Sequence, residues 1–219
     1  DKIVELKKRY NFRIIIDDAH GFGVMGAHGA GTSEHFGVMD EVDLYFGAFA
    51  KSMAAIGGFI AGPKSIINFL RYNLRSQIYA KSLPMALVEG CLKRLDLIRK
   101  GDERRKHLFD IARTLQKGLR EKGFEIGPAE ACITPVFING TVPEATNMLV
   151  DLRENYKIFC SVVVYPVVPK GVIMFRLICT AMHQMEHVEY TLKAFEEIRA
   201  KQAEGAYKGS DDIKDMAIK

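Results

Sequence analysis

The sequence predicts an α/β protein with two domains, and three observations support this fold class. The predicted strand at residues 12–16 holds three consecutive isoleucines, Ile14 to Ile16, and such an apolar run is expected for a strand buried on both faces of a sheet. Segments of strand character alternate with segments of helical periodicity along the rest of the chain. After Gly123 the alternation becomes more compact, which indicates a second and smaller α/β domain.

The other elements of the first half are predicted from local signals. A helix opens at Pro63, because proline is favoured in the first turn. A second helix covers residues 84–99, and Asp102 can cap a third that stops at Gly123. Further strands are expected over the whole chain at residues 43–49, 58–61, 134–139, 159–168 and 172–180.

In the second half, Thr141 and Glu144 form a capping box for a helix that ends near Tyr156. A last helix carries Val188, Leu192, Phe195 and Ile198 on one face. The polar tail after Gly205 is expected to be frayed. These elements divide the chain into a first domain over residues 1–85, connecting helices over 86–122, and a small domain with its tail over 123–219.

Composition excludes several classes of protein. The 219 residues are 48% hydrophobic and 26% charged with a net charge of +4, which excludes a disordered chain. No apolar run approaches the ~18 residues of a membrane span, and no concentrated basic stripe suggests nucleic-acid binding. The four cysteines are far apart and predict buried thiols in a reducing compartment, hence a cytoplasmic location without a zinc site.

Two glycine-rich segments resemble nucleotide-binding loops only weakly. Gly21, Gly23 and Gly26 match G-x-G-x-x-G, and Asp40 lies near the position of a ribose-binding acid, as does Asp43. No apolar helical stripe follows these glycines, although a dinucleotide-binding helix should start there. The segment GFIAGPKS has the wrong spacing for a phosphate loop. A nucleotide-binding oxidoreductase is therefore kept only as a remote alternative.

A stronger set of candidate residues is Asp17, His20 and Lys51. Asp17 ends one predicted strand and Lys51 follows another, and strand ends are where α/β folds place functional groups. The small residues after Lys51 are expected to desolvate its amine and favour the neutral, nucleophilic form. Asp, His and Lys together suit a pyridine-type cofactor. A surface lysine and a loop histidine remain the alternative on spacing alone.

Four segments then resemble one family, the α-oxoamine synthases. DDAHGFGVMG is similar to their D-E-A-H-S-x-G-x-x-G stretch, and FAKSMAAIGGFIAG to their cofactor-lysine motif. IYAKSLPM and YPVVPKGVIMFRLICTAMH resemble two later motifs, in the same order and at the same separation. The resemblance covers about residues 1–200.

The resemblance implies a pyridoxal-phosphate-dependent transferase of fold type I. The chain would then be the C-terminal part of the large domain, with a mostly parallel sheet, plus the small C-terminal α/β domain. The implied reaction is a decarboxylative condensation of an amino acid with an acyl-CoA, in a homodimer whose active site lies at the interface. Serine palmitoyltransferase-type sequences look most similar, glycine C-acetyltransferase is the runner-up, and 8-amino-7-oxononanoate synthase is third.

The resemblance also implies roles for individual residues. Asp17 would pair with the pyridinium nitrogen, His20 would bond the phenolic oxygen, and Lys51 would form the Schiff base and move the proton at the substrate α-carbon. Arg176 would bind the amino-acid carboxylate, since a guanidinium suits bidentate binding. A strand-end salt bridge is the alternative for Arg176. We interpret His183, in a predicted strand-to-helix turn, as structural and assign it no chemical role.

The sequence departs from the family pattern around the phosphate. Ala48 and Ala50 replace residues with hydroxyl groups, and Met174 replaces the first arginine of R-x-R. Lys81 replaces a threonine in the segment that, in the family, reaches the phosphate from the neighbouring subunit. We therefore expect Lys81 to supply the missing contact.

The front of the family pattern has no counterpart in these residues. We expect that an N-terminal portion is missing and that the strand at residues 12–16 has an unpaired edge. The 219 residues alone are therefore expected to be inactive and poorly soluble. A catalytically dead family member is disfavoured, because Asp17, His20, Lys51 and Arg176 are all present.

Overall fold

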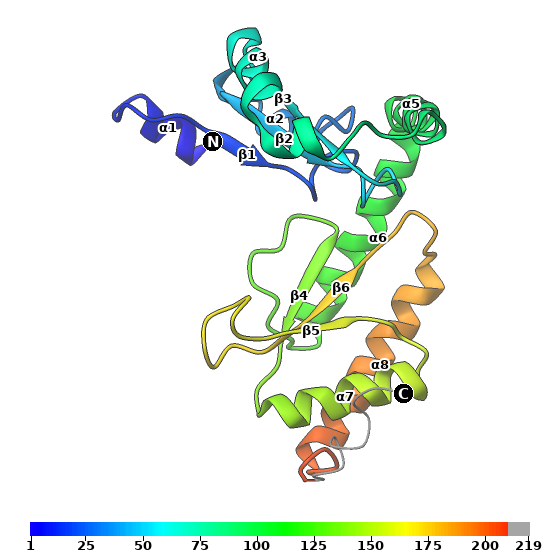
Figure 1. Ribbon diagram of the computed structural model, residues 1–219. Helices are drawn as coiled ribbons and strands as arrows, with labels where there is room; N and C mark the ends of the chain where they lie inside the picture. Colours follow the sequence, from blue (N-terminus) through cyan, green and yellow to red (C-terminus); the bar gives the residue numbers. More distant parts are fainter. Residues whose placement is uncertain (210–219) are drawn as a thin grey trace. The chain divides into compact units, whose positions relative to one another are not determined.

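The computed structural model describes residues 1–209 and forms two compact units, with the boundary between Arg105 and Lys106 (Figure 1). The boundary falls inside helix α6, so the predicted connecting helices are divided between the two units. The predicted frayed tail lies outside the described residues from 210 onward. Within residues 1–209, no helix is both long and apolar enough to cross a membrane.

The first unit contains a three-stranded sheet of order β1-β2-β3. Its strands are β1 (Ile15–Asp17), β2 (Leu44–Ala48) and β3 (Gly58–Ala61). Its helices are α1 (Lys2–Lys7), α2 (Thr32–His35), the 3-10 helix Met39–Glu41, α3 (Lys64–Asn73), α4 (Arg75–Tyr79) and α5 (Met85–Arg99). β1 and β2 are parallel, whereas β2 and β3 are antiparallel, so the described sheet has one pair of each kind.

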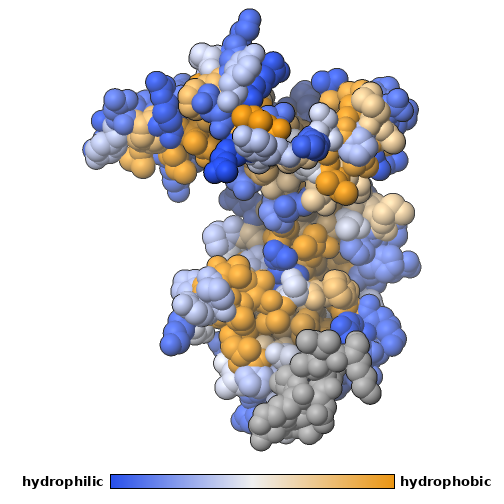
Figure 2. Space-filling model, in the orientation of Figure 1, coloured by the Kyte–Doolittle hydropathy of each residue, from blue (hydrophilic) through white to orange (hydrophobic). Residues whose placement is uncertain are grey.

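The strand predicted at residues 12–16 is shorter and more exposed than expected. β1 has only one neighbour within the described residues, because it lies at the edge of the sheet. Ile15 is 68% exposed, so the prediction of a strand buried on both faces is wrong, while the predicted unpaired edge is confirmed. Figure 2 shows that apolar residues also reach the surface elsewhere on both units.

The second unit contains a three-stranded antiparallel sheet of order β4-β6-β5. Its elements are most of α6 (Asp102–Glu121), then β4 (Ile133–Phe137), α7 (Val142–Glu154), β5 (Ser161–Val163), β6 (Met174–Ile178) and α8 (Met185–Ala203). Pro135 lies on edge strand β4, where the missing N–H breaks no ladder bond.

One face of this second sheet forms the core with the helices. Phe175 and Leu177 of β6 are buried, and Phe175 meets Phe195 of α8 edge to face, with ring centroids 6.4 Å apart. Leu119 of α6 and Leu152 of α7 are fully buried in the same core. Each such side chain contributes about 1.5–3 kcal/mol. The alternate residues of β6, including Arg176, therefore belong to the opposite face.

The predicted capping box at Thr141 and the predicted helix stop at Gly123 are confirmed, whereas Asp102, predicted as a cap, lies inside its helix. Thr141 Oγ1 accepts from the Glu144 N–H at 3.3 Å, and Glu144 Oε2 accepts from the Thr141 N–H at 2.7 Å, which completes the capping box. α6 ends shortly before Gly123, whose φ of 75° suits glycine. Asp102 is the first residue of α6 and pairs with Arg105, one turn further on.

Candidate functional site

The chain brings Asp17, His20 and Lys51 onto adjacent segments of the first unit. Asp17 is the last residue of β1 and lies opposite Phe46 of β2 in parallel register. The carboxyl ends of these two strands therefore meet at one edge of the sheet. His20 lies in the turn after β1, and Lys51 in the loop after β2.

A buried carboxylate next to Asp17 fixes the end of β1. Asp18 is 3% exposed and accepts hydrogen bonds from Thr32 N at 2.7 Å, Thr32 Oγ1 at 2.5 Å and Tyr45 Oη at 2.7 Å. Burial and the Asp18 carboxylate raise the pKa of Tyr45 far above its usual range, so this hydroxyl remains a donor. Our sequence reasoning missed Asp18, although an acid between Asp17 and Ala19 was visible.

Asp17 itself is directed outward by this arrangement. Its side chain is exposed, and its Oδ1 accepts the N–H of Ala19 at 3.1 Å, as in an Asx turn. Asp17 and Asp18 thus have different tasks, because one faces solvent and the other the interior. An outward carboxylate on a fixed backbone can hold a cation or a protonated ring nitrogen.

The loop that carries Lys51 is closed by its own backbone. Phe49 N–H donates to Gly57 O at 2.9 Å, Ala55 N–H to Phe49 O at 2.9 Å, and Ala54 N–H to Lys51 O at 3.0 Å. Met53 is 2% exposed and anchors the loop. Lys51 itself is exposed, so the desolvated lysine expected from its small neighbours is not found in the described residues.

The glycines of the weak nucleotide-binding motif have a packing role here. Gly23 has a φ of 80°, and a Cβ at this position would lie 2.6 Å from Ser52 Oγ. Glycine is therefore required where the His20 turn meets the Lys51 loop. Turns, rather than a long helix, follow these glycines, and α2 has only four residues. This geometry does not provide the helix N-terminus that a dinucleotide needs.

Ser52 is a further candidate that the sequence analysis did not identify. Its Oγ is shielded from solvent and has no hydrogen-bond partner within residues 1–209. A buried hydroxyl without a partner costs free energy, so a polar atom of a bound group would satisfy it. The only sequence signal was its position beside Lys51.

Arg176 and Lys81 lie outside the two loops that follow β1 and β2. Arg176 lies on β6 of the second unit, opposite Pro135 and Ser161, and its Nε is buried without a partner in the described residues. No salt bridge of Arg176 occurs there, which does not support the salt-bridge alternative. Lys81 of the first unit is exposed and has a φ of 67°, which is uncommon for a residue other than glycine.

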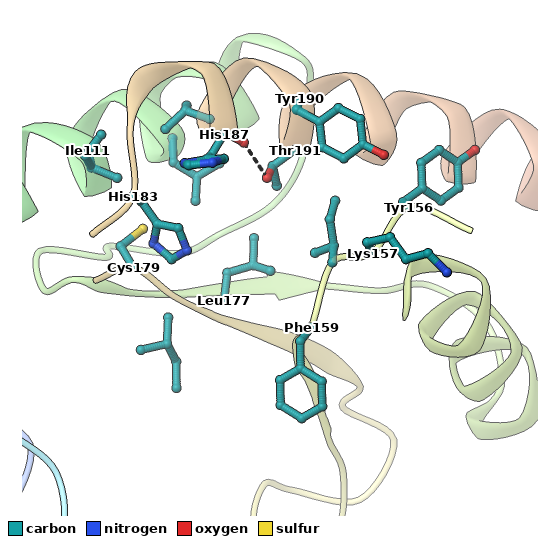
Figure 3. Close-up of a pocket in the computed structure, with 14 residues that line it drawn as sticks. Ile111, Tyr156, Lys157, Phe159, Leu177, Cys179, His183, His187, Tyr190 and Thr191 are labelled. Atoms are coloured by element: carbon teal, nitrogen blue, oxygen red, sulfur yellow. Dashed lines mark hydrogen bonds between the residues drawn. The ribbon is translucent and has the colours of Figure 1, made fainter. Parts of the chain in front are cut away.

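The second unit also contains a cavity of about 450 Å³ that includes none of the predicted site residues (Figure 3). His183 borders it, and its Nδ1 accepts from the Thr180 N–H at 3.0 Å. The His183 carbonyl accepts from His107 Nε2 at 2.9 Å. Burial and the nearby His187 lower the pKa of His183. These contacts hold the turn between β6 and α8, in agreement with the structural role assigned to His183.

The first unit fits pyridoxal phosphate on chemical grounds. Asp17 offers a carboxylate for the ring nitrogen, Lys51 an amine for the aldehyde carbon, and Ser52 an unsatisfied hydroxyl. His20 lies in the turn that follows β1. These are the group types that the cofactor requires.

Comparison with known proteins agrees with this chemistry. The family model described as aminotransferase class I and II matches residues 1–195. Cysteate-C-fatty acyltransferase of Capnocytophaga ochracea is 54% identical over 94% of this chain and 49% of its own length. Serine palmitoyltransferase of Bacteroides ovatus is 39% identical over 89% of this chain and 50% of its own length.

A solved structure gives the same result. Serine palmitoyltransferase of Sphingomonas wittichii superposes with a TM-score of 0.84 at 29% sequence identity, over 94% of this chain and 51% of its own. Other structural relatives at similar coverage contain pyridoxal phosphate. The chain spans about half the length of the curated relatives it matches.

Proposed function

Because this chain belongs to the aminotransferase class I and II family, we propose that the protein is a pyridoxal-phosphate-dependent acyltransferase. It condenses an amino acid with a fatty acyl-CoA thioester, with loss of carbon dioxide, and gives an amino ketone. The observation that carries this proposal is the placement of Asp17 at the end of β1 and of Lys51 in the loop after β2, the neighbouring parallel strand. The chemistry of a fatty acyltransferase is taken from the names of the relatives.

Each residue has a defined task in this proposal. When bound, pyridoxal phosphate supplies an electron sink for negative charge at the amino-acid α-carbon. Asp17 holds the ring nitrogen in its protonated state, and His20 donates to the phenolic oxygen. Lys51 anchors the aldehyde carbon and moves the proton at the α-carbon. Arg176 binds the substrate carboxylate through its planar guanidinium.

Cysteate is the amino acid we favour, and serine is the second candidate. The relative at 54% identity is a cysteate-C-fatty acyltransferase, whereas the serine palmitoyltransferase of Bacteroides ovatus is 39% identical. This revises the preference for serine that the motifs alone suggest. Cysteate carries a sulfonate in place of the serine hydroxyl, so the two substrates differ by a full negative charge.

A product assay tests the proposal. The full-length protein loaded with pyridoxal phosphate is incubated with palmitoyl-CoA and either cysteate, serine or glycine, and the amino ketone is identified by mass spectrometry. We expect cysteate to give the highest kcat/KM. A product from serine alone would contradict the choice of amino acid, and no product from any of the three would contradict the proposed reaction.

Lys81 is proposed to contact the cofactor phosphate, from the neighbouring subunit of a homodimer. It makes no ion pair with residues 1–209, and its left-handed backbone is otherwise unexplained. Lys81→Ala is therefore expected to weaken pyridoxal phosphate binding roughly tenfold, the value of one exposed charged contact at close range. The measurement is a cofactor titration followed by absorbance.

The exposed Lys64 on α3 provides the control for Lys81→Ala. Lys64→Ala removes the same charge from the same unit and should leave cofactor affinity unchanged. An unchanged affinity in Lys81→Ala would contradict the phosphate contact. A raised KM for cysteate with normal cofactor affinity would instead place Lys81 at the sulfonate.

We also propose a cytoplasmic location. All four cysteines are buried and unpaired. Burial raises the pKa of Cys160 to about 12 and that of Cys179 to about 11. Such thiols are protonated and unreactive at neutral pH, as expected of structural cysteines in a reducing compartment.

A further inference from the structure

An entirely apolar groove lies beside the loops that carry the proposed catalytic residues. It has a volume of about 370 Å³, within the range of ligand pockets. Its walls include Phe22, Phe49, Met53, Phe59, Leu83 and one face of α5. No lining side chain carries an oxygen or a nitrogen atom, so the groove has no side-chain means of recognising a polar group.

The position of the groove connects it to the reaction site. Phe49 and Met53 lie two residues before and two residues after Lys51, and Phe22 follows His20 by two residues. The two loops that hold the proposed catalytic groups therefore also form the walls of the groove. An occupant of the groove would therefore contact residues of the same two loops.

Close packing keeps the groove walls in place. Phe59 stacks on Phe49 with ring centroids 5.8 Å apart and meets Phe22 edge to face at 5.1 Å. A Cβ at Gly47 would lie 2.5 Å from the Phe59 ring, so the absence of a side chain at this position makes room for that ring. At the rim, Leu92 of α5 is 63% exposed, so the groove is open to solvent on that side.

We propose that this groove binds the hydrocarbon chain of the acyl-CoA substrate and selects its length. The inference rests on the proposed function, because only that reaction brings an acyl chain to Lys51. A long alkyl chain needs burial without polar partners, and each buried methylene strengthens binding roughly fourfold. The acyl carbon can then lie near the reactive loops while the chain extends along α5.

Two substitutions on α5 test the groove in the full-length protein. Val88→Phe adds bulk inside the groove, and Leu92→Glu places a carboxylate at its rim. The measurement is kcat/KM for palmitoyl-CoA, octanoyl-CoA and acetyl-CoA. In each variant we expect the ratio of palmitoyl to acetyl kcat/KM to fall at least tenfold.

Leu97→Glu is the matched control. Leu97 is also an exposed leucine of α5, 47% accessible, but it does not line the groove. This variant should keep the parental chain-length profile. An unchanged ratio in both Val88→Phe and Leu92→Glu, or an equal loss for all three thioesters, would overturn the inference. The absorption of bound pyridoxal phosphate verifies that each variant is folded.

A binding measurement separates this inference from the proposed reaction. Cis-parinaric acid, a fluorescent long-chain fatty acid, is titrated into the parent, Leu92→Glu and Leu97→Glu proteins. We expect binding to weaken at least tenfold in Leu92→Glu alone. If no thioester is turned over but this pattern holds, the reaction fails and the alkyl groove stands. If the groove is instead covered by another part of a longer chain or by a second copy, the probe does not bind the parent.

Discussion

Lys51→Ala is expected to abolish covalent attachment of pyridoxal phosphate and to reduce turnover roughly a thousandfold or more. The reason is that, in the proposed function, Lys51 supplies both the amine that anchors the cofactor and the base at the substrate α-carbon. The absorption band of the cofactor–lysine linkage and the rate of amino ketone formation measure the two effects. The backbone bonds that close the loop involve main-chain atoms, so alanine leaves them in place.

The control for Lys51→Ala is Lys64→Ala, which removes an exposed lysine outside the loop. It should retain both the band and full turnover. A visible band that persists in Lys51→Ala after denaturation and washing would show that another amine carries the cofactor. No band in the parent would contradict the cofactor assignment itself.

Asp17→Asn is expected to lower turnover roughly 10- to 1,000-fold while the cofactor stays attached to Lys51. A carboxylate within ~4–6 Å stabilises a positive charge by about 1–3 pKa units, and each unit corresponds to a factor of ten. The neutral amide keeps the shape of the side chain and removes this stabilisation. The measurement is kcat, with the absorption spectrum showing that the cofactor remains bound.

Asp40→Asn is the matched control, since Asp40 is an exposed acid of the same unit. It is also a residue that a nucleotide-binding protein would use for the ribose. Full activity in Asp40→Asn and low activity in Asp17→Asn supports the proposed roles. The opposite pattern would favour the nucleotide-binding alternative.

The sequence predicted the element order well because its signals were local. Pro63, the Thr141 capping box and Gly123 each mark a helix boundary by chemistry confined to one turn. Strand β1 was predicted less well. Its isoleucine run indicates burial, yet burial depends on neighbouring strands. Within residues 1–209, β1 has one neighbouring strand, β2.

The candidate site was predictable in part. Asp17, His20 and Lys51 stand out because their residue types and the motifs around them are specific, and the parallel register of β1 and β2 places two of their segments side by side. The roles of Asp18 and Ser52 were not predictable. Both depend on contacts or burial in three dimensions, which no local pattern encodes.

The contact of Gly23 with Ser52 ties two separate stretches of sequence to one another. Any side chain at position 23 would push against Ser52 in the loop that holds Lys51, so the Lys51 amine would move although its own residue is unchanged. Substitutions at 23 and 52 should therefore not be additive. The position of Lys51 therefore depends on a glycine in another segment. A change in either segment alone would shift the Lys51 loop relative to the turn that carries His20.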